Sequence, residues 1–214
     1  MTGTAPPIAQ PINAALRHVP VWAVYALGLL PPPVLVWMGA TGALGVEPIK
    51  ALEHALGEWA LNLLIAGLAI TPLRRLTGVN LMRFRRAIGL IAFYHLLSHL
   101  LVWLLLDVQL PAQIWADIVK RPYVTVGMAG FVLLVPLAAS SSDAALRRLG
   151  PLRWRRLHRL VYPAALLGAL HQVMVAKGFQ IEPLVMLGAV LGLLALRLPL
   201  APRRRRAARA ESRG

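Results

Sequence analysis

The sequence predicts an all-α membrane protein, a six-helix transmembrane bundle with both termini in the cytoplasm. Its 214 residues are 58% hydrophobic and only 14% charged, which is too apolar for an ordinary soluble domain. The apolar residues fall in runs close to the roughly 20 residues that a membrane-spanning helix needs. The 23 Lys and Arg residues, against 8 Asp and Glu, gather in short clusters between those runs, as loop charges do in membrane proteins.

Composition also excludes several classes of protein. A formal net charge of +15 would suggest a nucleic-acid partner for a soluble chain. Here the basic residues lie between apolar runs, so the lipid bilayer is the expected partner and nucleic acid is not. The chain has no cysteine, which excludes disulfides, thiolate zinc sites and iron–sulfur clusters.

We divide the chain into a disordered N-terminal tail (residues 1–18), a six-span domain (residues 19–198) and a basic cytoplasmic tail (residues 199–214). The N-terminal tail is rich in Pro and Ala, a composition typical of disorder. It lacks the basic region and cleavage site of a signal peptide, so the first span is expected to remain as an anchor. The six spans are expected at residues 19–39, 59–73, 87–106, 123–139, 153–177 and 183–198.

The loops between these spans predict the orientation. The first span contains Pro31, Pro32 and Pro33, each of which removes a backbone donor, so a break or kink is expected there. Two loops, residues 41–58 and 107–121, lean acidic, whereas the loops before the third and fifth spans and the C-terminal segment hold most of the arginines. The positive-inside rule puts the arginine-rich side in the cytoplasm and the acidic loops outside.

The candidate chemistry centres on the fifth span, which begins as a basic segment at Arg153 and becomes apolar. It carries His158 at the charged entrance and His171 thirteen residues further on, about 20 Å along a helix. One metal cofactor cannot bind both. The third span carries His95 and His99, whose i, i+4 spacing places them on one helix face.

Facing imidazoles in hydrocarbon, without cysteines or carboxylates beside them, favour haem b, one or two groups, held by axial histidines. His95 and His171 lie deep in their spans, where an imidazole is costly without a function. Other interpretations stay open for the rest: His158 as a residue at headgroup level, His99 as a hydrogen bond across the bundle, and His54 as an ordinary polar residue. Two axial histidines leave no open iron position, which favours electron relay over substrate chemistry.

Seven segments carry a resemblance to a known family. They resemble the haem-binding membrane subunit of the bacterial protein-methionine-sulfoxide reductase system, within the ferric-reductase-like transmembrane group. The resemblance spans residues 20–198, in order and with similar spacing. The segments are GVEPIK (45–50), EHALG (53–57), AITPLRR (69–75), RFRRAIGL (83–90), KRPYVTVG (120–127), RLHRLVY (156–162) and LHQVMVAK (170–177).

The resemblance implies a cytochrome b of the bacterial inner membrane. Such a subunit relays electrons from a cytoplasmic flavin reductase or the quinol pool to a periplasmic molybdopterin-containing methionine-sulfoxide reductase, for repair of oxidised periplasmic proteins. It also implies FMN as a further cofactor. The sulfoxide is expected to be reduced on the partner, so this chain is an electron-transfer subunit and its standing as an enzyme is left open.

The resemblance further implies haem ligands at His95, His158 and His171. His99 departs from the family pattern and leaves the pairing open: either His95 faces His171, or His99 takes that level while His95 pairs inward with His158. The two acidic outer loops are expected to dock the periplasmic partner. The cytoplasmic arginines are expected to hold the FMN phosphate.

Two alternatives remain. One is a haem membrane protein that reduces ferric iron or quinone directly, which would normally need an attached nucleotide- and flavin-binding domain. The other is a haem-free, proton-coupled transporter with histidine relays, a class that usually has carboxylates within the membrane. The colour of the purified protein separates the transporter from the haem proteins.

Overall fold

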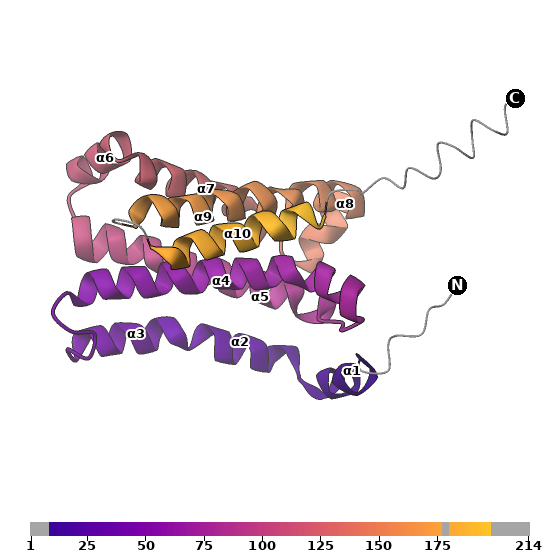
Figure 1. Ribbon diagram of the computed structural model, residues 1–214. Coiled ribbons are helices and arrows are strands. Elements are labelled where there is room, and N and C mark those ends of the chain that lie inside the picture. The colour runs from indigo at the N-terminus through magenta and orange to yellow at the C-terminus, as the bar shows by residue number, and fades with distance from the viewer. Residues whose placement is uncertain (1–8, 177–179, 198–214) are drawn as a thin grey trace, which may run out of the picture.

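The computed structural model describes residues 9–176 and 180–197, and the regular secondary structure in these ranges is helical throughout (Figure 1). The predicted tail at residues 199–214 and the end of the fifth predicted span, residue 177, lie outside the described residues. The elements are α1 (Ala9–His18), α2 (Val21–Leu29), α3 (Pro31–Ala40), α4 (Pro48–Thr77), η1 (Met82–Phe84), α5 (Arg85–Val102), η2 (Trp103–Val108), α6 (Pro111–Lys120), α7 (Pro122–Ala139), α8 (Asp143–Leu157), η3 (His158–Leu160), α9 (Val161–Val175) and α10 (Ile181–Ala195).

Four helical segments of the described chain are long and apolar enough to cross a membrane: Val21–Ala40, Pro48–Thr77, Met82–Val108 and Pro122–Ala139. The helices α9 and α10 have 15 residues each and run beside them in the bundle (Figure 1). The chain is therefore an all-helical, multi-pass membrane protein. Because two of the helices are shorter than a full span, the count of six spans stays a prediction.

Helix α4 contributes buried side chains to two clusters of the hydrophobic core. Its Leu61 and Leu68 pack with Ala165 and Ala169 of α9 and with residues of α10, while its Leu64 packs in a second cluster with α5, α7 and α9. Alanines on α9 let neighbouring helix backbones approach closely, as small residues do in membrane bundles. At one end of this bundle lie α6 and the turn between α3 and α4, and at the other lie α1 and α8 (Figure 1).

The second predicted span begins too late. Helix α4 starts at Pro48 rather than at residue 59, so the second half of the predicted acidic loop, residues 41–58, is helical. Proline is favoured at the first position of a helix, and the residues after it bury Leu52 and Leu56. The helix ends at Thr77, and Gly78 after it has a φ of 79°, the left-handed conformation of a helix C-cap.

The fifth predicted span is not one helix. Residues 153–157 belong to α8, a 3₁₀ turn follows at His158–Leu160, and only Val161–Val175 forms the apolar helix α9. Within α8, Gly150 has a φ of 73° and is followed by Pro151, a combination that kinks the chain. His158 therefore lies at a junction between two helices.

Two smaller expectations are also refined. The break at the prolines of the first span is confirmed between α2 and α3, yet Leu30 keeps helical dihedrals (φ −68°, ψ −41°). The disorder predicted for residues 1–18 is wrong over residues 9–18, which form α1. Hydrogen bonds hold this helix in place, because the Asn13 side chain donates to the Gly78 carbonyl (3.1 Å) and accepts from the Asn80 amide (2.8 Å).

Candidate functional site

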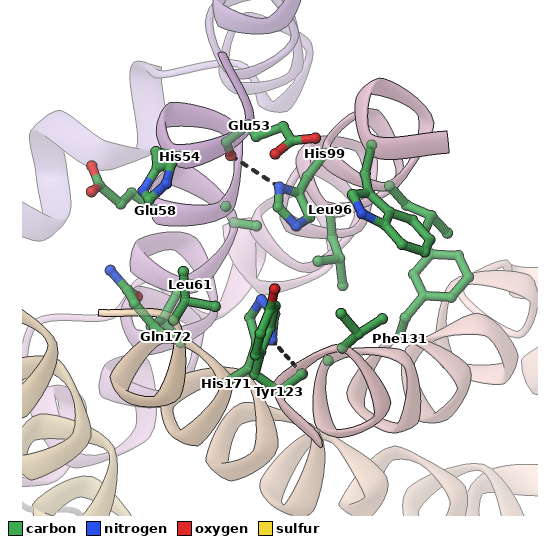
Figure 2. Close-up of a pocket in the computed structure, with 18 of the residues that line it drawn as sticks. Glu53, His54, Glu58, Leu61, Leu96, His99, Tyr123, Phe131, His171 and Gln172 are labelled. Carbon is green, nitrogen blue, oxygen red and sulfur yellow. Dashed lines mark hydrogen bonds between the residues drawn. The ribbon is translucent and has the colours of Figure 1, made fainter. Parts of the chain in front are cut away.

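A cavity of about 1200 Å³ lies among α4, α5, α7 and α9, toward the α6 end of the bundle (Figure 2). This volume lies just above the roughly 300–1,000 Å³ of most small-molecule sites, so a large cofactor can enter. Apolar side chains line its interior, among them Leu61, Leu96 and Phe131. The polar lining residues include Glu53, His54, Glu58, Asp107, Asp117, Arg121, His99 and His171.

His99 of α5 and His171 of α9 face one another across this cavity (Figure 2). Their ring centroids are 6.3 Å apart and their planes make an angle of 75°. His99 belongs to the third predicted span and His171 to the fifth, so the two residues are far apart in the sequence and the fold brings them together. The fold therefore brings His99, rather than His95, to the level of His171, while the pairing of His95 with His158 stays a prediction.

Backbone carbonyls of neighbouring helices orient both rings. His99 Nδ1 lies 2.9 Å from the Glu53 carbonyl oxygen on α4, and His171 Nδ1 lies 2.7 Å from the Tyr123 carbonyl oxygen on α7. A carbonyl can only accept, so each Nδ1 carries the proton and donates it. Each Nε2 is then left with its lone pair, which is the state of a metal-ligating histidine supported by a hydrogen bond to its other nitrogen.

The spacing of the rings fits two axial ligands of one metal. An imidazole nitrogen lies about 2 Å from a metal that it ligates, and its ring centre lies roughly 1 Å further out, so two opposed imidazoles have centroids about 6 Å apart. The observed 6.3 Å matches this separation. Among the described residues no group of three or more His, Cys, Asp or Glu side chains could hold a bare ion. A haem supplies its own equatorial nitrogens, so the donor set present fits a haem.

His95 is placed differently. It is fully buried on α5, and its Nδ1 lies 2.9 Å from the carbonyl oxygen of Ile91, four residues earlier on the same helix. Its ring contacts Trp59 and Tyr94, with both centroids 5.9 Å away. Its Nε2 is buried without a hydrogen-bond partner, yet His95 is not among the described residues that line the cavity.

His158 lies in η3 at the α8 end of the bundle, stacked on Trp154 with ring centroids 3.8 Å apart. Its Nδ1 lies 3.1 Å from the Trp154 carbonyl oxygen, and its Nε2 is buried without a hydrogen-bond partner. Measured along the helices from the level of the cavity pair, His95 is about 6 Å and His158 about 20 Å away. That difference in depth argues against His95 and His158 as the two ligands of one iron.

The α8 end also holds two arginines that turn toward one tyrosine. Arg197 donates to the Tyr162 hydroxyl (3.0 Å) and to the Leu68 carbonyl, and Arg85 lies beside the same hydroxyl. Neither arginine takes part in the ion pairs of the described residues, and Arg197 Nε is buried without a partner. An anion is the group that such an arrangement accommodates best.

Sequence reasoning found the four histidines but missed the groups that orient them. The carbonyls of Glu53 and Tyr123 act through the backbone, so their side chains give no signal. His54 lines the cavity beside Glu58 (Figure 2), which gives it a place at the site that the sequence did not indicate.

Comparison with known proteins places the chain in a family. Residues 55–169 match the family described as ferric reductase like transmembrane component. A protein of Rhodospirillum rubrum named protein-methionine-sulfoxide reductase heme-binding subunit MsrQ is 51% identical over 195 residues, covering 89% of this chain and 92% of its own. The chain belongs to the MsrQ family.

Other relatives carry the same name. The protein of Rhizobium meliloti is 51% identical over 179 residues, covering 83% of this chain and 82% of its own. That of Agrobacterium fabrum is 47% identical over 179 residues and covers 83% of both chains. No solved structure matches the chain. The resemblance drawn from the seven sequence segments is thereby confirmed.

Proposed function

We propose that this chain is a membrane cytochrome b that relays electrons across the bacterial inner membrane to a periplasmic methionine-sulfoxide reductase subunit. The observation that carries the proposal is the opposed pair of His99 and His171, with each Nδ1 tied to a carbonyl and each Nε2 left to bind a metal. The names of the relatives, which are haem-binding subunits, support haem as the group bound there.

The residues of the cavity perform three tasks in this proposal. His99 and His171 would hold haem b through Nε2, and bound haem would supply one-electron oxidation and reduction of its iron. Leu61, Leu96 and Phe131 would exclude water from the ring faces. With two imidazoles fixed by backbone carbonyls, ligation need not change between oxidation states. This arrangement favours electron transfer and leaves no open position for a substrate.

A second cofactor site near His158 would carry electrons through the cytoplasmic half of the membrane. Its buried Nε2 has no partner in the described chain, and it lies about 20 Å from the level of the cavity pair. Of the two further ligands that the resemblance implies, His95 and His158, we propose His158 alone for an inner group, because the His95 ring packs against Trp59 and Tyr94.

The distribution of charge supports the direction of transfer. Arginines gather at the α8 end, and Glu47, Glu53, Glu58, Asp107 and Asp117 lie at the α6 end. By the positive-inside rule the α8 end is cytoplasmic, with both termini, and the cavity pair lies near the periplasmic face. We propose that the molybdopterin-containing partner docks on this face, where α6 exposes Trp115 (69%) and Val119 (65%). Crosslinks from the partner confined to the α8 end would contradict this docking.

At the cytoplasmic end we propose that Arg85 and Arg197, with the neighbouring loop arginines, bind the phosphate of FMN supplied with electrons from a flavin reductase or quinol. The shared Tyr162 contact and the absence of an acidic partner among the described residues support this. Flavin fluorescence should show weaker FMN binding in the R85Q and R197Q variants than in K120Q, whose side chain belongs to α6 at the opposite end of the bundle. Equal binding in all three would discard the site.

The experiment that tests the function is a reduced-minus-oxidised absorbance spectrum of the detergent-purified protein, followed by addition of the oxidised periplasmic subunit. A b-type signal that disappears when the partner and methionine sulfoxide are added is the expected result. A colourless protein, despite haem supply, would instead favour the transporter class.

A further inference from the structure

Each histidine of the cavity pair sits in a notch of the same design. The carbonyl that accepts from His99 belongs to Glu53, and Gly57 follows four residues later on α4. The carbonyl that accepts from His171 belongs to Tyr123, and Gly127 follows four residues later on α7. Both glycines line the cavity. Two different helices thus present a carbonyl at position i and a glycine at position i+4 to an incoming imidazole.

The geometry of a helix explains why a glycine belongs at this position. Residues i and i+4 lie one above the other on the same face of a helix. The carbonyl at i already accepts the amide of i+4, and a side chain at i+4 would cover the approach to its second lone pair. Without a Cβ there, a ring from a neighbouring helix can reach the carbonyl.

The two notches differ in how tightly they hold the ring. A Cβ added at Gly127 would lie 2.8 Å from His171 Nδ1 and 3.0 Å from its Cε1, closer than packed atoms approach. A Cβ added at Gly57 would lie 3.5 Å from His99 Nδ1 and 3.6 Å from its Cε1, which is ordinary contact. The His171 ring is held by its hydrogen bond and cannot move aside without losing it.

We propose that Gly127 is a positioning residue for the axial pair, with Gly57 in the same but looser role. The notch at Gly127 fixes the tautomer of His171 and the rotation of its ring, and the two notches together set the 75° angle between the imidazole planes. This inference rests on the proposed function, since the angle acquires meaning only when both rings bind one haem.

The angle predicts a spectroscopic property. In low-spin ferric haem, near-perpendicular axial imidazoles give a strongly anisotropic electron paramagnetic resonance (EPR) signal, whereas near-parallel imidazoles give a rhombic one. The wild-type protein should therefore show the strongly anisotropic form. The EPR signal reports the orientation of the imidazole rings, and a change in the stability of the protein alone would not alter it in the same way.

The test compares G127A with G57A and with a matched control, G89A. Gly89 lies on α5, and a Cβ added there meets no atom within 4 Å. All three changes raise helix propensity, so a loss confined to G127A cannot come from a weakened helix. The purified proteins are compared by haem-to-protein ratio after washing, by EPR and by elution profile in detergent.

The expected result is about a tenfold or greater loss of haem retention in G127A, the usual scale for removing support behind a metal ligand, with its remaining EPR signal shifted away from the wild-type form. G57A should change little and G89A not at all. Wild-type retention and an unchanged EPR signal in G127A would overturn the proposal. If G127A does not fold, the wild-type EPR signal decides alone: a rhombic signal of parallel imidazoles would overturn it. A wild type without haem would instead contradict the proposed function itself.

Discussion

The two histidine pairs of this molecule differ in which helix orients them. In the cavity, His99 and His171 donate from Nδ1 to carbonyls on other helices, 46 and 48 residues away in sequence. His95 and His158 donate to the carbonyl four residues earlier in their own segment. A hydrogen bond within the same segment does not depend on where the other helices pack, whereas a hydrogen bond to another helix ties ring orientation to the packing of the bundle. The comparison indicates that the cavity pair is built for precise placement.

The largest expected effect is the loss of one pair's cofactor. H99A and H171A each remove an axial ligand, so each should abolish the main b-type signal while the protein stays inserted in the membrane; loss of metal support alone costs about 10–100-fold in affinity. Absorbance spectra of solubilised membranes measure this. Full haem content in either variant would show that the facing rings are not the ligands.

A smaller effect is expected from substitution of His95, which the comparison separates from the cavity pair. In H95L an apolar side chain replaces a fully buried imidazole whose Nε2 has no partner. Removing a buried unsatisfied polar group should make folding more favourable by about 1–3 kcal/mol, offset in part by the lost bond to Ile91. The apparent Tm in detergent should therefore be equal or higher, with the haem signal kept. Loss of the haem signal in H95L would show that His95 is a haem ligand and would contradict the difference drawn between the two histidine pairs.

The smallest expected effect concerns the scaffold at the α8 end. Arg86 of α5 and Asp143 of α8 form an exposed ion pair of 2.7 Å, and the Arg86 guanidinium lowers the pKa of the Asp143 carboxyl below its usual value of 3.8. A lowered folded-state pKa means that the contribution to stability is present above that usual value and is lost as the pH falls through the folded one. Below a pH of about 4, the apparent Tm of wild type should approach that of D143N. A difference that persists at the lowest pH would contradict this origin.

The fold could be predicted where hydropathy decides it. Residues 87–106 and 123–139 were placed within a few residues of the observed helices, because their apolar runs are bounded by arginines and a serine turn. The start of α4 is not predicted, because the charged residues Lys50, Glu53 and Glu58 give residues 48–58 the composition of a loop between spans. In the fold Glu53 and Glu58 line a cavity rather than face lipid, a placement that hydropathy along the chain does not indicate.

The site was predictable only in part. The i, i+4 spacing of His95 and His99 showed that they share a face, but spacing on one helix cannot tell which of two rings meets a partner on another. That choice depends on Glu53 and Tyr123, whose carbonyls are chemically the same as any others in the chain. The break at His158–Leu160 was hidden because the residues around it are basic and apolar in the order expected of a continuous helix.

The central claim is that His99, and not His95, is the axial partner of His171. The most direct measurement is a potentiometric titration of H99M beside H95M, because methionine in place of an axial histidine raises the reduction potential of a haem. We expect H99M to retain haem with a midpoint potential higher by on the order of 0.1 V, and H95M to titrate like wild type. A raised potential in H95M with an unchanged potential in H99M would contradict the account.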